Sequence, residues 1–316
     1  MPPEDSRAYE AGHPGPWPEL LRPTPSTPFA GVRSHLDVPY AVSPGFRPLV
    51  LDLHLPDDGR RAARPVVVYA HGGGFFTGTK AMGPWRFLLD AGYAVASVAY
   101  RLSGESRFPG PVHDVAAAVR WVRANADTYG LDTDRVVGFG SSAGGYLVGA
   151  VALGADDAWL VGRLGPHERT PCTLAAVIDH CAPNDYLRLD DDVPDDVVEV
   201  SNGPGSSAAR FLGYVPSDRP AEADRARLSR YVRPDSPPFL IVHGDADRRV
   251  GIGQSRRLHR ALRDQGVPAE LVVLPGAGHA DAAFDTASLH EATLAFLSRA
   301  LGQPGKSLGG RQTAEQ

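Results

Sequence analysis

The chain has 316 residues, of which 42% are hydrophobic and 22% are charged, and its formal net charge is −5. This composition supplies enough apolar side chains for a large core and excludes a wholly disordered chain. The acidic balance and the lack of an extended basic stripe argue against a nucleic-acid partner, and no apolar run is long enough for a membrane-spanning helix.

The predicted elements begin after an arm, residues 1–30, that is rich in proline, glycine and acidic residues. Such a composition predicts little structure of its own. The arm has no basic start followed by an apolar stretch, so it does not resemble a secretory signal, and we expect a cytoplasmic protein. Two strands are predicted next, at residues 33–40 and 48–55. Leucine at every second position of the later strand is typical of an antiparallel edge strand.

The middle of the chain alternates near-continuous apolar runs with helical stretches, which is typical of a buried and mostly parallel sheet. The clearest helix covers residues 112–129, where apolar residues recur at helical spacing and Gly130 supplies the stop. A closing helix is predicted at residues 289–301. Right-handed crossovers place such helices on both faces, so the fold class is α/β with a doubly wound sheet. The predicted strands of this sheet are residues 65–70, 93–100, 136–140, 174–180, 238–243 and 269–274.

One segment, residues 185–231, interrupts this alternation with an acidic stretch and a patch of glycine and serine. We interpret it as a small cap or lid inserted into a single domain, residues 31–301. The alternative is a long irregular surface loop, since long loops in compact domains are usually functional or disordered. The composition of the tail, residues 302–316, predicts a flexible end.

The chain contains two cysteines, Cys172 and Cys181. They form no C-x-x-C pair of the kind that binds zinc or performs redox chemistry, so they predict no metal site. They flank a predicted strand whose extended length separates them. This favours two buried free thiols over a disulfide.

A nucleophile motif follows the predicted strand 136–140. Residues 140–144, Gly-Ser-Ser-Ala-Gly, fit G-x-S-x-G and open a helix of small residues. The motif holds its serine on a strained turn, and the neighbouring residues must be small so that the Oγ atom is exposed at the carboxyl edge of the sheet. Such a motif also arises by chance in glycine-rich chains, so the prediction of Ser142 as nucleophile depends on its partners.

A glycine loop, residues 71–75 with the sequence His-Gly-Gly-Gly-Phe, follows the predicted strand 65–70. Flexible backbone can aim N–H groups at a developing oxyanion, and one preset donor contributes about 3 kcal/mol. The candidate donors are the N–H groups of Gly73, Gly74 and Ala143. The alternatives are a turn needed only for tight packing and a phosphate cradle, but the loop lacks the Lys-Ser/Thr ending of a P-loop.

A serine nucleophile needs a base, and the base needs a carboxylate that holds it in the right tautomer. In α/β sheets with this motif, the order along the chain is serine, acid, histidine. Two turns that follow predicted strands, residues 243–247 and 275–279, match this order. They make His279 the candidate base and either Asp247 or Asp245 the candidate acid, and spacing alone leaves that choice open.

Three other histidines have simpler interpretations. His180 lies at a predicted strand end and His290 lies within a helical pattern, which favours structural roles for both. His71 begins the glycine loop, and we expect it to shape that loop rather than to move protons.

Together these residues resemble the α/β-hydrolases of the hormone-sensitive-lipase and BD-FAE type, which are bifunctional feruloyl/acetyl-esterase-like proteins, and the related kynurenine formamidases. The resemblance covers about residues 35–300, and its motifs include residues 71–75, 140–144 and 243–250. It implies Ser142 as nucleophile. The remaining residues that the resemblance implies are Asp247 as the acid, His279 as the base, Gly73, Gly74 and Ala143 as oxyanion donors, and Asp114 as a structural partner.

The sequence Gly-Phe-Phe at residues 74–76 stands where the formamidases tend to have a Tyr-Trp pair, which favours an esterase. The expected activity is hydrolysis of a small-molecule carboxylic ester through an acyl-enzyme, with no metal or organic cofactor. The alternatives are hydrolysis of an aryl formamide or another amide, and acyl transfer or cyclisation on a biosynthetic intermediate. A non-catalytic receptor is the least favoured alternative, because no member of the triad is missing. The sequence leaves a homodimer open.

Overall fold

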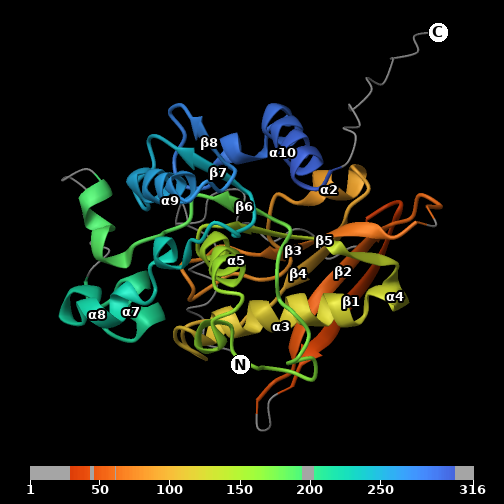
Figure 1. Cartoon of the computed structure of the whole chain (residues 1–316), viewed down its shortest axis with the longest axis horizontal. Coiled ribbons are helices and arrows are strands. Elements are labelled where there is room, and N and C mark those ends of the chain that lie inside the picture. Colours follow the sequence, from red (N-terminus) through yellow and green to blue (C-terminus); the bar gives the residue numbers. More distant parts are fainter. Residues whose placement is uncertain (1–28, 43–45, 61, 194–202, 303–316) are drawn as a thin grey trace, which may run out of the picture.

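The computed structural model describes residues 29–42, 46–60, 62–193 and 203–302. They form one eight-stranded sheet in the order β1-β2-β4-β3-β5-β6-β7-β8 (Figure 1). The pairs β1–β2 and β2–β4 are antiparallel, and the other neighbouring strands are parallel, as predicted. The strands are β1 (Val32–Ala41), β2 (Leu49–Pro56), β3 (Arg64–Ala70), β4 (Ala94–Val98), β5 (Leu131–Ser141), β6 (Ala176–His180), β7 (Phe239–Gly244) and β8 (Ala269–Leu274).

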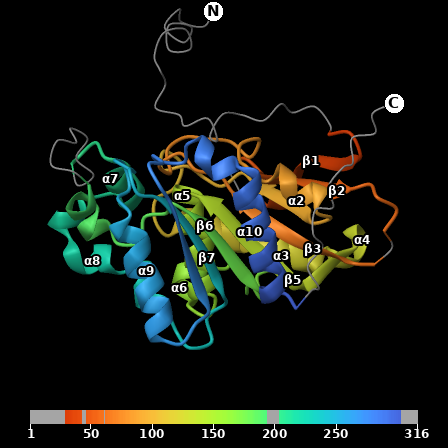
Figure 2. The same ribbon diagram turned by 90° about the horizontal axis from the view of Figure 1, so that it is seen from above.

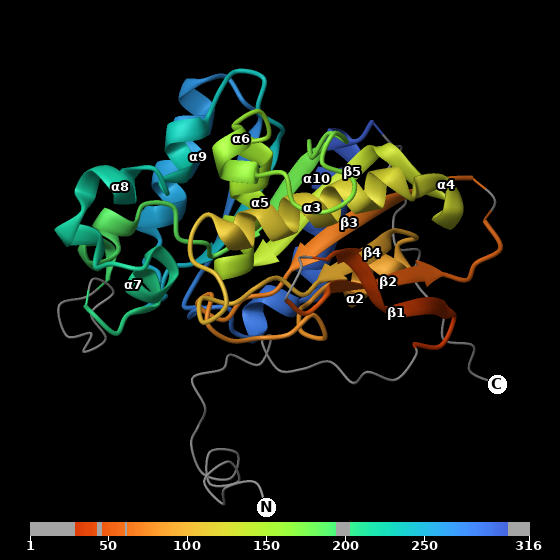
Figure 3. The same cartoon turned by 90° about the horizontal axis from the view of Figure 1, so that it is seen from below.

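Helices cover both faces of the sheet (Figures 1 and 3). α3, α5 and α9 pack on the face with the larger hydrophobic core, and α2 and α10 pack on the other face. The helix predicted at residues 112–129 is divided into α3 and α4, and Gly130 ends it with a left-handed φ of 65°. The helices are α2 (Arg86–Asp90), α3 (Gly110–Ala124), α4 (Ala126–Tyr129), α5 (Ala143–Leu153), α6 (Ala158–Val161), α7 (Ser207–Leu212), α8 (Pro220–Asp224), α9 (Gly253–Asp264) and α10 (Ala287–Ala300).

The prediction of an edge position for the leucine-rich strand is wrong. β2 lies between β1 and β4, and its polar residues Asp52 and His54 are each only 6% exposed. Lys80 donates to Asp52 over 2.8 Å, and the His54 ring stacks on Trp85 with 4.9 Å between the ring centroids. The alternating polarity of β2 did not predict this burial. A polar side chain can be buried when it has a partner, and here the partners come from outside the strand.

Several predicted segments fall wholly or partly outside the described residues. They are the arm 1–30, apart from its last two positions, the stretch 194–202 of the inserted segment, and the tail 302–316, apart from Gly302. Among the residues that are described, no helix is long and apolar enough to cross a membrane.

The inserted segment, residues 185–231, lies between β6 and β7 in the chain, and its described part is built from short helices, including α7 and α8. Figure 2 shows α7 and α8 together at the end of the molecule away from β1 and β2. Phe211 of α7 stacks on Phe75 with 3.8 Å between ring centroids, and the hydroxyl of Tyr146 donates to the carbonyl of Ala226 over 2.8 Å. The described part of the segment is therefore packed on the glycine loop and on α5.

A buried glutamine joins the start of this segment to α9. Gln254 is fully buried, and its Oε1 atom accepts from the backbone N–H groups of Asn184 at 2.9 Å and Asp185 at 2.7 Å. Its Nε2 atom donates to the carbonyl of Arg188 at 3.1 Å and to the carboxylate of Asp192 at 2.8 Å. One side chain thus hydrogen-bonds to four polar groups at the turn out of the sheet, and Arg257 supplies a further donor to Asp192.

Candidate active site

The turn from β5 into α5 holds Ser142 in a strained conformation. Its φ of 53° and ψ of −118° are unusual for a residue with a side chain, and its N–H donates to the carbonyl of His180 over 2.6 Å. Glycine is required on both sides. A Cβ atom on Gly140 would lie 2.2 Å from the carbonyl carbon of Gly144, and one on Gly144 would lie 1.9 Å from the carbonyl oxygen of Ala70.

Replacing Gly144 by alanine should therefore destabilise the fold by about 3 kcal/mol and lower the expected ester turnover by about 100-fold. The added methyl group must displace the backbone at the end of β3, which carries the glycine loop. Chemical denaturation and steady-state kinetics measure the two effects. Gly205→Ala is the control, because a Cβ atom at that position meets nothing within 4 Å. Equal stability and turnover in the two variants would contradict the argument.

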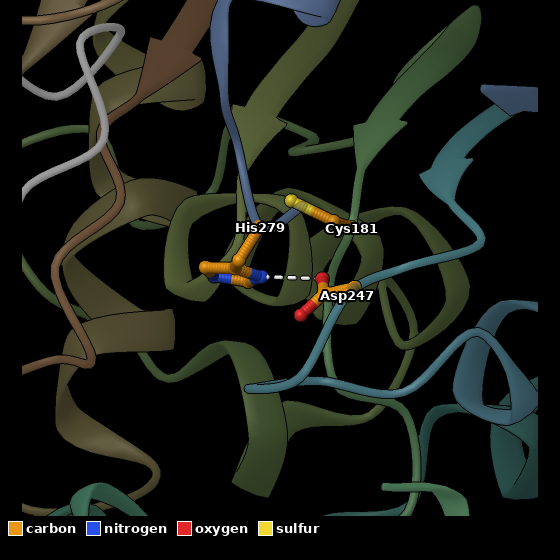
Figure 4. Close-up of side chains that lie close together, drawn as sticks. All are labelled: Cys181, Asp247 and His279. Carbon is orange, nitrogen blue, oxygen red and sulfur yellow. Dashed lines mark hydrogen bonds and ion pairs between the residues drawn. The ribbon is translucent and has the colours of Figure 1, made fainter. Parts of the chain in front are cut away.

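Two side chains from different loops complete a hydrogen-bonded line with Ser142. The Nε2 atom of His279, on the loop after β8, lies 2.8 Å from the Oγ atom of Ser142. The Nδ1 atom of the same ring lies 2.6 Å from the Oδ2 atom of Asp247, on the loop after β7. Figure 4 shows the His279 ring and the Asp247 carboxylate facing each other. The sequence-predicted nucleophile, base and acid are thus within hydrogen-bonding distance of one another.

The carboxylate of Asp247 is held from several directions. Its Oδ1 atom accepts from the N–H groups of Arg249 at 2.8 Å and Val250 at 3.0 Å, and the His243 ring lies 3.2 Å from Oδ2. Burial by itself would raise the pKa of this carboxyl, but His279 and His243 outweigh burial and keep the pKa below its usual range. Asp247 therefore stays ionised beside the ring that it orients.

Asp245 points to a different partner. Its Oδ1 atom accepts from the N–H of Gly276 over 2.6 Å, which ties the turn after β7 to the turn after β8. Asp247, and not Asp245, contacts His279. Spacing could not distinguish the two because both follow the same strand, and only the direction of each side chain separates them.

The glycine loop lies beside the serine turn. The contact between Gly144 and the carbonyl of Ala70 brings the start of the loop against the first turn of α5. Gly73 has a φ of 123° and Gly74 a φ of 58°, conformations that favour glycine. Throughout the described residues, the N–H groups of Gly73, Gly74 and Ala143 donate no hydrogen bond to the protein. Three candidate donors are thus left available near Ser142.

His71 has the shaping position that the sequence predicted for it. Its Nδ1 atom lies 2.7 Å from the carbonyl oxygen of Gly72, and its ring stacks on Tyr100 with 4.4 Å between centroids. Burial lowers the pKa of His71 to about 4, so the ring is neutral at pH 7. The hydroxyl of Tyr100 donates to the carbonyl of His71 over 2.8 Å, which fixes the first residue of the glycine loop.

In the described part of the chain, neither His180 nor His290 hydrogen-bonds to the Ser142 side chain. The ring of His180 packs edge-on against Phe139, 4.8 Å between centroids, and neither of its nitrogens has a partner among the described residues. His290 stacks on Phe87 and lies 2.7 Å from a carboxylate oxygen of Asp285. Both rings are therefore placed in packing contacts.

Cys181 is a neighbour of the site that sequence reasoning missed. It follows β6, at the same carboxyl edge from which Asp247 and His279 emerge, and that position is the signal that could have found it. Cys181, Asp247 and His279 each offer one atom that could bind a metal ion. These three atoms lie within 4.8 Å of one another (Figure 4). Burial, with the nearby carboxylates of Asp247 and Asp179, raises the pKa of the thiol well above its ordinary value. A metal ion here would need the thiolate and would compete with the hydrogen bond between Asp247 and His279.

Both cysteines are free and buried, as predicted. Cys172 precedes β6 and Cys181 follows it, so the strand separates them along its length.

A second buried acid, Asp179, lies behind the serine turn. It is 1% exposed, and its Oδ1 atom accepts from the N–H of Ala182 over 3.0 Å. A Cβ atom on Gly145 would lie 2.7 Å from the same oxygen, so the carboxyl packs against the first turn of α5. Burial raises the pKa of Asp179 to about 6. Sequence reasoning missed this residue, because an acid inside an apolar strand has no recognisable motif.

The raised pKa of Asp179 makes stability depend on pH. The carboxyl ionises near pH 4 in the unfolded chain and near pH 6 in the folded protein. Between these values a rising pH favours the unfolded state, so the free energy of unfolding decreases. Asp179→Asn should therefore become more stable relative to wild type from pH 4 to pH 7, by up to about 3 kcal/mol. Urea unfolding at several pH values measures this difference. A difference that does not change with pH would contradict the prediction.

Comparison with known proteins agrees with this architecture. The family model BD-FAE matches residues 51–262. Esterase LipQ of Mycobacterium tuberculosis is 31% identical over 80% of this chain, which spans 58% of that protein's length. An ethyl acetate hydrolase of Pseudomonas putida is 35% identical over 71% of this chain and 68% of its own length. A truncated carbohydrate esterase from gut microbiota superposes with a TM-score of 0.79, at 26% identity, over 89% of this chain and all of its own.

The family model extends from β2 to α9 and so includes the glycine loop, the serine turn and Asp247, while His279 lies beyond it in the chain. The matched residues make up more than half of the chain, and the superposed structure has the same overall architecture. The chain therefore belongs to the BD-FAE family and has the α/β-hydrolase fold.

Proposed function

We propose that this chain is a serine carboxylesterase that cleaves a small-molecule ester through an acyl-enzyme on Ser142. The observation that carries the proposal is the unbroken line of hydrogen bonds from Asp247 through His279 to Ser142, which lies on the turn after β5 at the carboxyl edge of the sheet. The family membership and the named esterases among the relatives support it.

In the proposed reaction the Oγ atom of Ser142 attacks the ester carbonyl while the Nε2 atom of His279 takes its proton. Asp247 holds the Nδ1–H of the ring and stabilises the imidazolium that forms. The tetrahedral intermediate expels the alcohol, which receives the proton from His279, and the acyl group stays on Ser142. Water then attacks the acyl-enzyme with His279 again as base, and the acid is released.

The negative charge on the tetrahedral oxygen needs donors that are already in place. We assign this role to the N–H groups of Gly73, Gly74 and Ala143. Their lack of other acceptors within the described structure and their closeness to the serine turn support the assignment. Ala143 is also the first residue of α5, so the positive end of that helix favours the same charge.

We further propose that residues 31–301 form one hydrolase domain and that the inserted segment, residues 185–231, is its cap. The packing of Phe211 against Phe75, which directly follows the assigned oxyanion donors, supports a cap that helps to shape the acyl or alcohol site. The cytoplasmic location stays a prediction of the sequence.

A fluorophosphonate probe tests the proposal, because it adds to an activated serine and mimics the tetrahedral intermediate. Peptide mass spectrometry should find one label per chain on Ser142, and complete labelling should abolish hydrolysis of p-nitrophenyl acetate and butyrate. An N-formyl aromatic amine in the same assay distinguishes the formamidase alternative, which predicts faster turnover of the formamide. Full ester hydrolysis by labelled protein, or a label on another residue, would contradict the proposal.

A further inference from the structure

A groove of about 630 Å³ lies between the glycine loop and the inserted segment. Phe76, two residues after the last glycine of that loop, forms one wall and is 45% exposed. α7 and the turn after it form the opposite wall, with Tyr214 in that turn.

The charged side chains that line this groove are mostly positive. Three arginines line it, Arg107, Arg210 and Arg219, against the single carboxylate of Asp218. Within the described residues, none of the three guanidinium groups forms an ion pair. Three arginines against one carboxylate make the described lining of the groove locally positive, in a chain with a net charge of −5.

Two of the three guanidinium groups are held in place by contacts other than ion pairs. Arg210 lies over the ring of Phe76, 5.3 Å from its centroid, and its Nε atom donates to the carbonyl of Gly205 over 3.1 Å. Arg219 lies over the ring of Tyr214, also 5.3 Å from the centroid. Arranged in this way, the arginines keep N–H donors free for planar or tetrahedral oxyanions, which guanidinium groups bind in bidentate fashion.

The groove borders the elements that hold the reacting groups. Phe75, between the glycines and Phe76, stacks on Phe211, the residue after Arg210. A Cβ atom on Gly74 would lie 2.8 Å from the Oγ atom of Ser207, so the start of α7 packs closely against the glycine loop. The groove is thus lined from the same two segments, residues 73–76 and α7, that make these contacts.

We propose that this groove, through Arg107, Arg210 and Arg219, binds an anionic group carried by the ester substrate, a carboxylate or a phosphate. The inference rests on the proposed esterase function and specifies its substrate class. The aromatic rings of Phe76 and Tyr214 suit the apolar part of such a substrate next to its charge. An anionic ester should then be hydrolysed faster than its neutral analogue at the same concentration.

Two matched ester pairs test the proposal. 4-Acetoxybenzoate and 4-acetoxybenzamide place the charge on the leaving group, and monomethyl succinate and methyl succinamate place it on the acyl group. At low salt, kcat/KM for the anion of at least one pair should exceed that for the neutral partner by about tenfold. The preference should shrink at 0.5 M NaCl, because the Debye length falls below about 5 Å.

Arg210→Gln and Arg219→Gln should each reduce the preference for the anionic ester by about threefold to fivefold, mainly by raising the KM of that ester. Hydrolysis of neutral p-nitrophenyl acetate should stay within twofold of wild type. Arg256→Gln, on the exposed side of α9, is the matched control and should keep the preference. A preference that is absent from both pairs in wild type, or that survives both groove variants, would overturn the inference while p-nitrophenyl acetate hydrolysis still supports the esterase.

Free benzoate separates a substrate subsite from a regulatory one. Competition by benzoate against 4-acetoxybenzoate, weakened in Arg210→Gln, supports the subsite. Faster hydrolysis of p-nitrophenyl acetate in the presence of benzoate would identify an effector site and would also overturn the inference.

Discussion

Ser142→Ala should lower kcat for ester hydrolysis by at least about 10⁴-fold and leave the fold intact. The substitution removes the Oγ atom that lies 2.8 Å from the Nε2 atom of His279. It removes little packing, because alanine keeps the Cβ atom. The strained φ of 53° is equally unfavourable for both residues, so the stability should change by less than about 1 kcal/mol. Kinetics with p-nitrophenyl butyrate and thermal unfolding measure the two effects.

Ser141→Ala is the matched control for this prediction. Ser141 is the adjacent residue in the chain, and its Oγ atom is 3.5 Å from the hydroxyl of Tyr69 rather than near His279. The variant should keep turnover within about tenfold of wild type and should still react with a fluorophosphonate. A Ser142→Ala protein that hydrolyses esters at the wild-type rate would exclude Ser142 as the nucleophile.

Asp247→Asn should lower kcat by about 10⁴-fold near neutral pH. The carboxylate accepts the Nδ1–H of His279 over 2.6 Å and stabilises the ring when it takes the serine proton. An amide at this position carries no charge, and its NH₂ group can hold the ring in the wrong tautomer. The geometry of the loop should survive, because the amide oxygen can still accept from the N–H groups of Arg249 and Val250.

Asp245→Asn is the control for Asp247→Asn. It follows the same strand, but Asp245 accepts from the N–H of Gly276, an interaction that an amide oxygen also makes. Its turnover should stay within about tenfold of wild type. Equal losses of kcat in the two variants would contradict the prediction that Asp247 orients His279 and stabilises its charged form.

The same carboxylate should affect acid stability. The folded-state pKa of Asp247 lies below its unfolded value near 3.9, so its contribution is present above about pH 4 and is lost as the pH falls through the folded-state pKa. The free energy of unfolding of Asp247→Asn should therefore fall less steeply than that of wild type below pH 4. Urea unfolding measures this slope.

Much of the fold was predictable because local patterns and the tertiary structure agree. Near-continuous apolar runs predicted the buried parallel strands, and Gly130 ends the helical region as its left-handed φ requires. The edge position predicted for β2 failed for a physical reason. Asp52 and His54 look solvent-facing in the sequence, but Lys80 and Trp85, from a later part of the chain, cover them.

The candidate site was likewise predictable from the sequence only in part. Each motif stands in the sequence at the end of a strand, so the chain itself indicated Ser142, His279 and an acid after β7. The choice of Asp247 over Asp245 depended on the direction of a side chain, which spacing does not determine. Cys181 and Asp179 had no motif, and they approach the site only because parallel strands bring their carboxyl ends to one edge.

The sequence by itself determined the alternation of strands and helices and the residue types available for acyl chemistry, because hydrophobic periodicity and glycine turns are local properties. The tertiary structure alone decided how segments distant in the chain meet. It placed the carboxylate of Asp247 beside His279, closed the inserted segment onto α9 through Gln254, and gathered Arg107, Arg210 and Arg219 around one groove. Such contacts depend on side-chain direction and long-range packing, which no local pattern encodes.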